Sequence, residues 1–111
     1  MSDPSTEKVR FRTESPTRLV DKITGFGDPG TLTIEGGRIS FQGKREQFAG
    51  RILEVGDKML GSGISFGMTY SRNFKRWISV SYESEGETKQ AYFRGGSHER
   101  LKQALEASIQ P

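Results

Sequence analysis

The 111-residue chain has no cysteine, one histidine and no long apolar run. Without cysteine it can form no disulfide framework, thiolate nucleophile or Cys-ligated zinc site, and with one histidine any metal site would depend almost wholly on carboxylates. No segment approaches the ~18 consecutive apolar residues of a membrane span, and the N-terminus MSDPSTEKVR lacks the apolar region of a secretory signal. We expect a soluble, cytoplasmic protein without a metal or another cofactor.

A mass of 12.4 kDa supports one modest hydrophobic core and therefore one domain. Residues 1–8 are polar and lack periodicity, which predicts a flexible N-terminal tail. Residues 9–29 carry scattered apolar positions whose secondary structure stays open, and they lead into a glycine-rich turn at 25–30. The periodic patterns all lie in residues 30–111, to which we assign the folded domain.

Two β-hairpins are the clearest local signals. Alternating runs joined by Gly36 and Gly37 predict the first over residues 31–42, and a loop at 84–87 predicts the second. In both registers apolar residues face apolar residues across the strands. The expected pairs are Glu35 with Arg38, Ile34 with Ile39, Thr33 with Ser40, Leu32 with Phe41, Val80 with Ala91 and Ile78 with Phe93.

The sequence between the hairpins predicts further short elements. Residues 48–55 indicate a strand or two short ones, and 55–58 indicate a turn. Strict alternation over 64–70 predicts a half-buried strand, and 71–76 reads as a basic loop.

The pattern changes to a helical period after Gly95 and Gly96. Ser97 is a suitable N-cap, and one apolar stripe follows, made of Leu101, Ala104, Leu105 and Ile109. A helix this short is not stable alone, so its stripe must cover an open end of the sheet. The fold class is therefore mainly β, with six or seven short strands in meander order and one C-terminal α-helix.

This layout resembles the pleckstrin-homology (PH) superfold. The block from Gly30 to Ile109 is similar to GRAM-type and bacterial PH-like domains in its first hairpin, its strand at 77–82 and its closing strand and helix. The resemblance implies a bent antiparallel barrel whose open corner is capped by the helix, with a non-catalytic role in binding phosphoinositides, peptides or proteins. In phosphoinositide-binding members, basic residues flank a longer loop between the first two strands. If residues 31–35 are the first strand, that loop is only Gly36 and Gly37 here, and we expect the standard headgroup site to be missing.

Positive charge is concentrated in the middle of the chain, where residues 30–76 hold eight Lys/Arg against four Asp/Glu. These residues form a candidate patch for an anionic ligand, or they are simply solvated loop residues. Two aromatics beside them are candidate interface anchors, unless they pack on the barrel. The candidate patch is Lys44, Arg45, Arg51, Arg72, Lys75 and Arg76, and the aromatics are Phe74 and Trp77.

Other polar features favour ordinary structural roles. His98 has no orienting partner at a recognisable spacing, and the glycines at 61–63 lack the strand and helix of a phosphate loop. Glu83, Glu85 and Glu87 indicate solvated charge near a hairpin tip rather than a calcium site.

The sequence thus favours a non-catalytic interaction module that binds a protein or peptide, either beside the helix or by adding a strand to an open edge. The alternative is weak binding to anionic phospholipid membranes through the central basic patch. A hydrolase is disfavoured because the sequence shows no arrangement of a nucleophile with a base. Nucleic-acid binding is disfavoured because no ribonucleoprotein-type aromatic motif is present. Homo-oligomerisation stays open.

Overall fold

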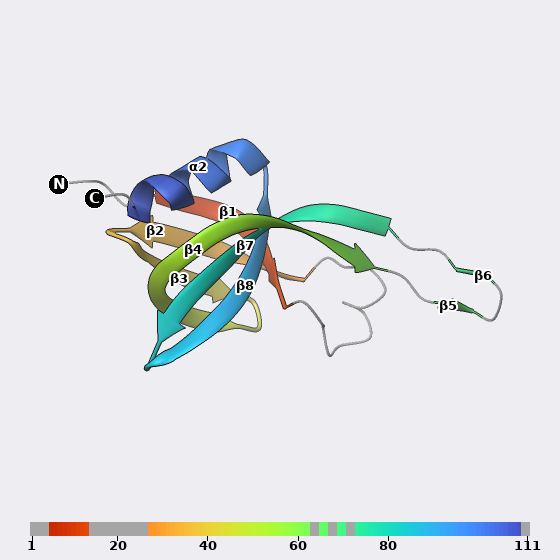
Figure 1. The fold of residues 1–111 in the computed structure, drawn as a ribbon, viewed down its shortest axis with the longest axis horizontal. Helices are drawn as coiled ribbons and strands as arrows, with labels where there is room; N and C mark the ends of the chain where they lie inside the picture. The colour runs from red at the N-terminus through yellow and green to blue at the C-terminus, as the bar shows by residue number, and fades with distance from the viewer. Residues whose placement is uncertain (1–4, 14–26, 63–64, 67–68, 71–72, 110–111) are drawn as a thin grey trace.

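A computed structural model describes residues 5–13, 27–62, 65–66, 69–70 and 73–109 of the chain. These residues form antiparallel strands and a C-terminal helix, as Figure 1 shows, so the expected mainly β class is confirmed. In chain order the elements are β1 (Ser5–Arg12), β2 (Asp28–Glu35), β3 (Arg38–Gly43), β4 (Gln47–Ser62), β5 (Ser65–Phe66), β6 (Thr69–Tyr70), β7 (Asn73–Ser84), β8 (Glu87–Gly95) and α2 (His98–Ile109).

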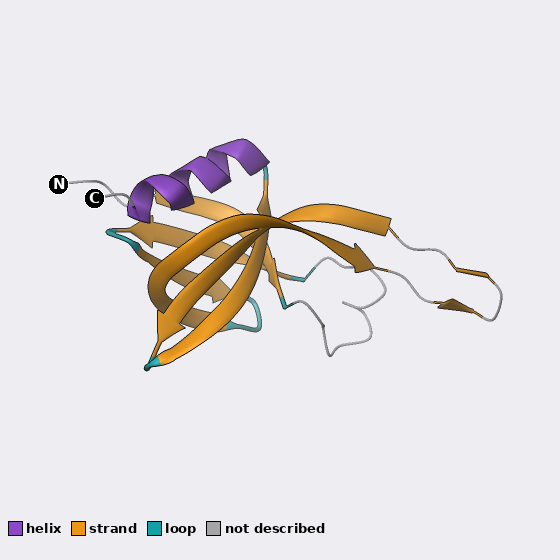
Figure 2. Ribbon diagram, in the orientation of Figure 1, coloured by secondary structure: helices purple, strands orange, loops and turns teal. Residues whose placement is uncertain are grey.

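Six strands pair in the order β1-β2-β3-β4-β7-β8, and β8 also pairs with β1, so that the sheet closes on itself. Each neighbouring pair is antiparallel, and the order around the ring follows the chain except that β5 and β6 intervene between β4 and β7, which is the meander order expected from the sequence. The remaining strands, β5 and β6, pair only with each other. Figure 2 shows the closed sheet with α2 lying along it.

Both predicted hairpins form in the predicted register, including Leu32 with Phe41 and Ile78 with Phe93. Gly36 and Gly37 both have positive φ, of 57° and 77°, as a primed two-residue turn requires. The second turn is tighter than the expected loop 84–87, because Ser84 and Glu87 pair and leave two residues at the tip.

The N-terminal part of the chain differs from the prediction. The expected tail is a strand from Ser5 onward, and β1 is paired on both sides, with β2 and with β8. The first two strands are therefore β1 and β2, and Gly36 and Gly37 join the second strand to the third, which removes the ground for expecting no headgroup site. The nonlocal pairs satisfy the backbone even though β1 has only two apolar residues, Val9 and Phe11. Asp28 likewise begins β2 instead of lying in a turn. Residues 14–26, which include the start of that predicted turn, lie outside the described residues.

The middle of the chain also differs. β4 runs without a break through the predicted turn at 55–58, because β7 pairs with it along this stretch and a register shift between Ile52 and Glu54 accommodates its path. The alternating segment 64–70 is no single strand, since Ser65 pairs with Tyr70 and Phe66 with Thr69. The expected basic loop is strand from Asn73 onward, because it pairs with the extended end of β4.

The core fills the interior of the closed sheet. It includes Leu32, Phe41, Ile78, Val80 and Phe93, each at most 1% exposed. The helix completes this core: it contacts β2, β4, β7 and β8, and Leu101 and Leu105 pack into the same cluster.

The helix begins and docks largely as the sequence predicts. The Arg100 amide donates a 3.3 Å hydrogen bond to Ser97 Oγ, which confirms the expected N-cap. Leu101 and Leu105 of the predicted stripe are buried and Ala104 is partly buried. Ile109 is 37% exposed, because it lies at the last turn of α2.

Candidate ligand-binding surfaces

The predicted basic residues lie on three parts of the molecule. Lys44 and Arg45 belong to the β3–β4 turn, and Arg51 lies near the start of β4. Lys75 and Arg76 lie on β7, while Arg72 is outside the described residues.

The strand register keeps the described members apart. Arg51 is paired with Glu83, whereas Arg76 is paired with Met59. Positions 51 and 59 are about 26 Å apart along β4 at ~3.3 Å per residue. Arg51 also forms a 3.6 Å ion pair with Glu83, and Arg76 forms one of 2.7 Å with Glu99. The described basic residues therefore do not gather into one patch.

The β3–β4 turn is organised by a buried carboxylate, that of Asp28. Its Oδ2 accepts hydrogen bonds from the backbone amides of Arg45, at 2.9 Å, and Glu46, at 2.8 Å. The Arg45 guanidinium lies 3.5 Å from Oδ1 and balances the charge of this 2% exposed residue. Asp28 and Arg45 therefore have a structural role in this turn.

Trp77 is not an interface anchor. Only 1% of it is exposed, and it packs with Leu60 and Tyr92 in a small cluster separate from the main core. The Arg12 guanidinium lies 5.6 Å from the centre of the indole ring, a cation–π distance. The alternative interpretation, a packed indole, therefore holds for Trp77. Phe74 lies within β7 and not at a loop tip.

Outside the ring, β4 and β7 continue as a two-stranded arm, which projects to the right in Figure 1. We define this arm as residues 58–62 and 73–77. β3 pairs with β4 only as far as Arg51, and β8 pairs with β7 only from Ile78 onward. Among the described strands, therefore, none covers either outer edge of the arm.

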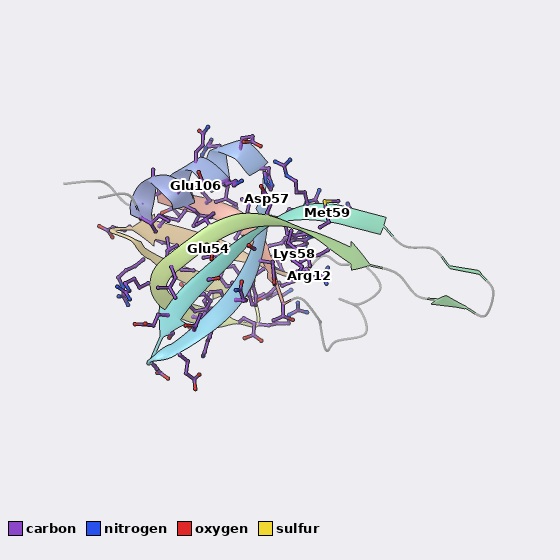
Figure 3. The ribbon with its side chains drawn as sticks, viewed as in Figure 1. Arg12, Glu54, Asp57, Lys58, Met59 and Glu106 are labelled. Carbon is purple, nitrogen blue, oxygen red and sulfur yellow. The ribbon has the colours of Figure 1, made fainter. Side chains whose placement is uncertain are left out.

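A charged cluster joins the start of α2 to the sheet, and Figure 3 labels Asp57 at its centre. Asp57 Oδ1 lies 2.6 Å from His98 Nε2, and Asp57 Oδ2 lies 2.5 Å from Lys102 Nζ. The hydrogen bond from Lys102 holds the pKa of Asp57 below its ordinary value, and in return raises the pKa of Lys102. His98 is thus in contact with Asp57 and Arg76, in contrast to the solvated role expected from the sequence.

His98 has two described side-chain partners, which share one ring nitrogen. Arg76 Nε lies 3.0 Å from the same Nε2 atom that faces Asp57. Neither of these two partners carries a hydroxyl that the imidazole could activate. The arrangement fixes the first turn of α2 against β4 and β7.

Other chemistry-bearing groups in the described part of the chain are few. No group of three or more His, Asp or Glu side chains there could hold a metal ion, and Glu83, Glu85 and Glu87 are exposed at the β7–β8 hairpin. Burial raises the pKa of the Tyr82 hydroxyl, with Glu46 adding to the effect. No helix in this part is long and apolar enough to cross a bilayer.

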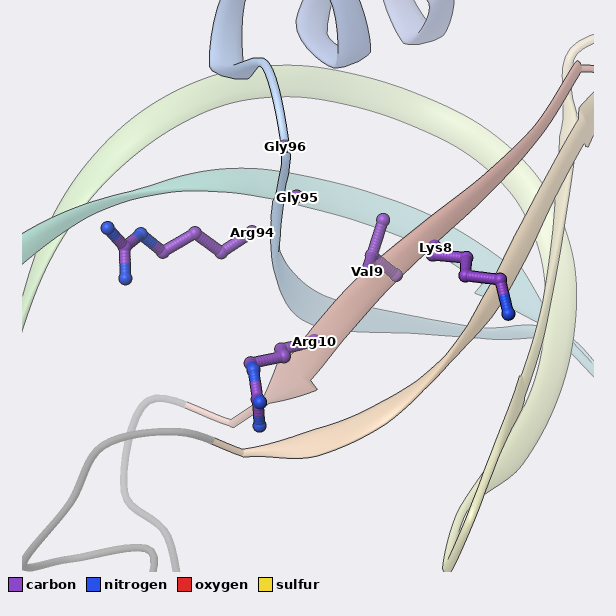
Figure 4. A pocket seen from close by; sticks show the side chains of 6 residues that line it. All are labelled: Lys8, Val9, Arg10, Arg94, Gly95 and Gly96. Carbon is purple, nitrogen blue, oxygen red and sulfur yellow. The ribbon is translucent and has the colours of Figure 1, made fainter.

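An open hollow of about 330 Å³ lies where β1 meets β8, close to the start of α2 (Figure 4). The hollow is lined by Lys8, Val9, Arg10, Arg94, Gly95 and Gly96. Arg10 and Arg94 are directly paired across the two strands, and Lys8 is two positions from Arg10 on the same face of β1. We call these three cations and the two glycines the basic hollow. Sequence reasoning missed it because its residues lie at opposite ends of the chain.

The chain was compared with known proteins at the level of sequence and of structure. It matches no protein-family model, no curated protein and no solved structure.

Proposed function

We propose that the protein is a non-catalytic interaction module with a PH-like fold, and that it binds an extended, acidic segment of a protein partner along the arm. The fold part of the proposal is supported by the closed antiparallel sheet whose interior is completed by a single C-terminal helix. The binding part is carried by one observation, the outer edges of the arm, which no third described strand covers.

An uncovered strand edge offers backbone N–H and C=O groups to an incoming strand. The backbone hydrogen bonds supply affinity, and side chains on alternate positions supply specificity. On β7, the edge of the arm spans Asn73 to Trp77, which is long enough for a short added strand.

The side chains of the arm favour an acidic partner. Lys75 is exposed and faces Leu60 across the arm. It forms no ion pair among the described residues, whereas Arg76 on the other face is ion-paired with Glu99. Lysines on an edge oppose pairing with a second basic edge, whereas they attract a strand that carries Asp or Glu. Met59, 54% exposed, adds an apolar contact beside Arg76.

Two observations favour this interpretation over attachment to an anionic membrane. The described members of the predicted central patch lie in three separate places, and Trp77 is buried and cannot insert into a bilayer. The arm, in contrast, keeps Lys75 next to an uncovered backbone edge.

The experiment is titration of the protein with a synthetic peptide of alternating Val and Glu, followed by NMR amide shifts and hydrogen exchange. We expect saturable binding with added protection at Asn73–Trp77. Lys75→Glu should weaken binding by about tenfold, as removal and reversal of one interfacial charge does, whereas Lys89→Glu on β8 should have little effect.

A peptide of alternating Val and Lys should not bind. Protection elsewhere than on the arm, or equal weakening by Lys75→Glu and Lys89→Glu, would refute the proposed site. Binding to phosphatidylserine vesicles that equals binding to the peptide would favour the membrane alternative.

A further inference from the structure

The basic hollow combines features that are unfavourable for the isolated fold. Like charges directly opposite each other on neighbouring antiparallel strands repel, and Arg10 and Arg94 occupy such a position. Lys8 adds a third positive charge to the same hollow. In Figure 4 the Lys8, Arg10 and Arg94 side chains point away from one another around the hollow, as mutual repulsion favours.

No acidic side chain lines the hollow among the described residues. The nearest acid in sequence, Glu7, has the opposite facing on β1 and forms a 2.9 Å ion pair with Arg100 of the helix. In the described part of the chain, the Lys8 and Arg94 side chains form no hydrogen bond or ion pair. The positive charge of these two residues is therefore available to a ligand.

The backbone adds to this positive field. Gly95 and Gly96 line the hollow and lead directly to Ser97, the N-cap of the 12-residue helix α2. The amino end of a helix carries a partial positive charge. A Cβ at Gly96 would meet nothing within 4 Å, so a ligand can approach this backbone closely.

From these features we infer a binding site for a phosphate monoester at the basic hollow, independent of the peptide-binding arm. A monoester carries about −1.5 to −2 charges at pH 7 and several acceptor oxygens. Arginine binds such a group through two parallel N–H donors, and Lys8 supplies a point charge on the other side. The hollow is open, so the remainder of the ligand extends into solvent.

The positions of the cations and the volume of the basic hollow limit the charge and the size of the ligand. Lys8 on β1 and Arg94 on β8 line one hollow from two strands, and two positive charges suit a compact anion with two charges better than a single carboxylate. A volume of about 330 Å³ holds a phosphate with a small attached group. The monoester can belong to a soluble metabolite or to the headgroup of phosphatidic acid, and the test separates these two sources.

The first experiment measures thermal stability and heat of binding with phenyl phosphate, with sodium chloride at equal ionic strength as the reference. We expect a saturable rise in Tm with phenyl phosphate only. Arg94→Gln should raise the Kd about tenfold, the usual effect of losing a hydrogen bond to a charged group, and Arg94→Lys should raise it less. The matched control, Lys89→Gln, lies on the same strand and should leave the Kd unchanged.

A second readout does not depend on the ligand. Because Arg94 repels Arg10, Arg94→Gln should leave the Tm in phosphate-free buffer unchanged or raise it. A fall in Tm would contradict the inferred repulsion. Equal Tm values in chloride and phenyl phosphate, or equal effects of Arg94→Gln and Lys89→Gln on the Kd, would overturn the site.

Sedimentation with vesicles identifies the source of the ligand. Phosphatidylcholine vesicles containing phosphatidic acid are compared with vesicles carrying the same charge as phosphatidylglycerol, which is a diester. Pelleting with phosphatidic acid alone, lost in Arg94→Gln, indicates the lipid headgroup. Binding of phenyl phosphate without pelleting indicates a soluble monoester. Equal pelleting with both lipids, without saturable binding of phenyl phosphate, contradicts recognition of a monoester.

Discussion

The backbone amide of Gly37 donates a 2.7 Å hydrogen bond to the Oγ atom of Ser108. The bond joins the tip of the first hairpin to the last turn of α2, residues 71 positions apart in the chain. At its other end α2 is held by the contact of Asp57 with His98 and by the ion pair of Asp57 with Lys102. The helix is thus fixed at both ends, and its buried face is held over the interior of the sheet.

Ser108→Ala should lower the free energy of unfolding by about 0.5–1.5 kcal/mol, because the Gly37 amide loses its acceptor. Urea denaturation followed by tryptophan fluorescence measures the change. Gln103→Ala, on the exposed side of the same helix, is the control and should have little effect. A Ser108→Ala protein as stable as the parent would show that this bond contributes nothing.

Leu105→Asp should destabilise the fold by more than about 3 kcal/mol, since it places a charge at a fully buried position of the core. Gln103→Asp introduces the same side chain at an exposed position and should change little. Circular dichroism melting compares the two. Equal melting temperatures would mean that the helix does not dock on the sheet.

Asp28→Ala should cost about 2–4 kcal/mol, because it removes the acceptor of the Arg45 and Glu46 amides inside a buried turn. Asp28→Asn keeps one acceptor oxygen and should cost less. The measurement is chemical denaturation of both variants at pH 7. An alanine variant that is no less stable than the asparagine variant would contradict this role.

The Asp57–Lys102 pair predicts a defined pH dependence of stability. Since the folded pKa of Asp57 is below its ordinary 3.8, its contribution is complete above that pH and is lost as pH falls through the folded value. Since the folded pKa of Lys102 is above 10.5, its contribution is lost as pH rises through that higher value.

Urea denaturation of the parent and of Asp57→Asn across pH 2–8 tests the acidic side. The stability difference should be constant from about pH 5 to 8 and should shrink below pH 3.8. A difference that does not vary with pH would mean that the carboxylate charge plays no part.

The sequence predicted the parts of the fold that depend on neighbouring residues. Gly36 with Gly37 set the first turn, and apolar pairs such as Ile34 with Ile39 set its register. The Ser97 cap and the stripe through Leu101 likewise followed from local spacing.

The parts that were missed depend on distant partners. β1 is a strand because it pairs with β2 and β8, and its own residues show little apolar alternation. Gly56 and Asp57 look like a turn, yet β7 holds them extended. The basic hollow was missed for the same reason, because Arg10 and Arg94 become neighbours only when β1 pairs with β8.

The closure of the sheet by β1 against β8 is the central claim, because it builds both the closed fold and the basic hollow. NMR spectroscopy of the unliganded protein tests it through cross-strand nuclear Overhauser effects and amide exchange. We predict contacts between the backbones of Val9 and Gly95 and of Phe11 and Phe93, with slowly exchanging amides in β1. The absence of these contacts, with β1 amides exchanging at the rate of an unfolded chain, would contradict the account.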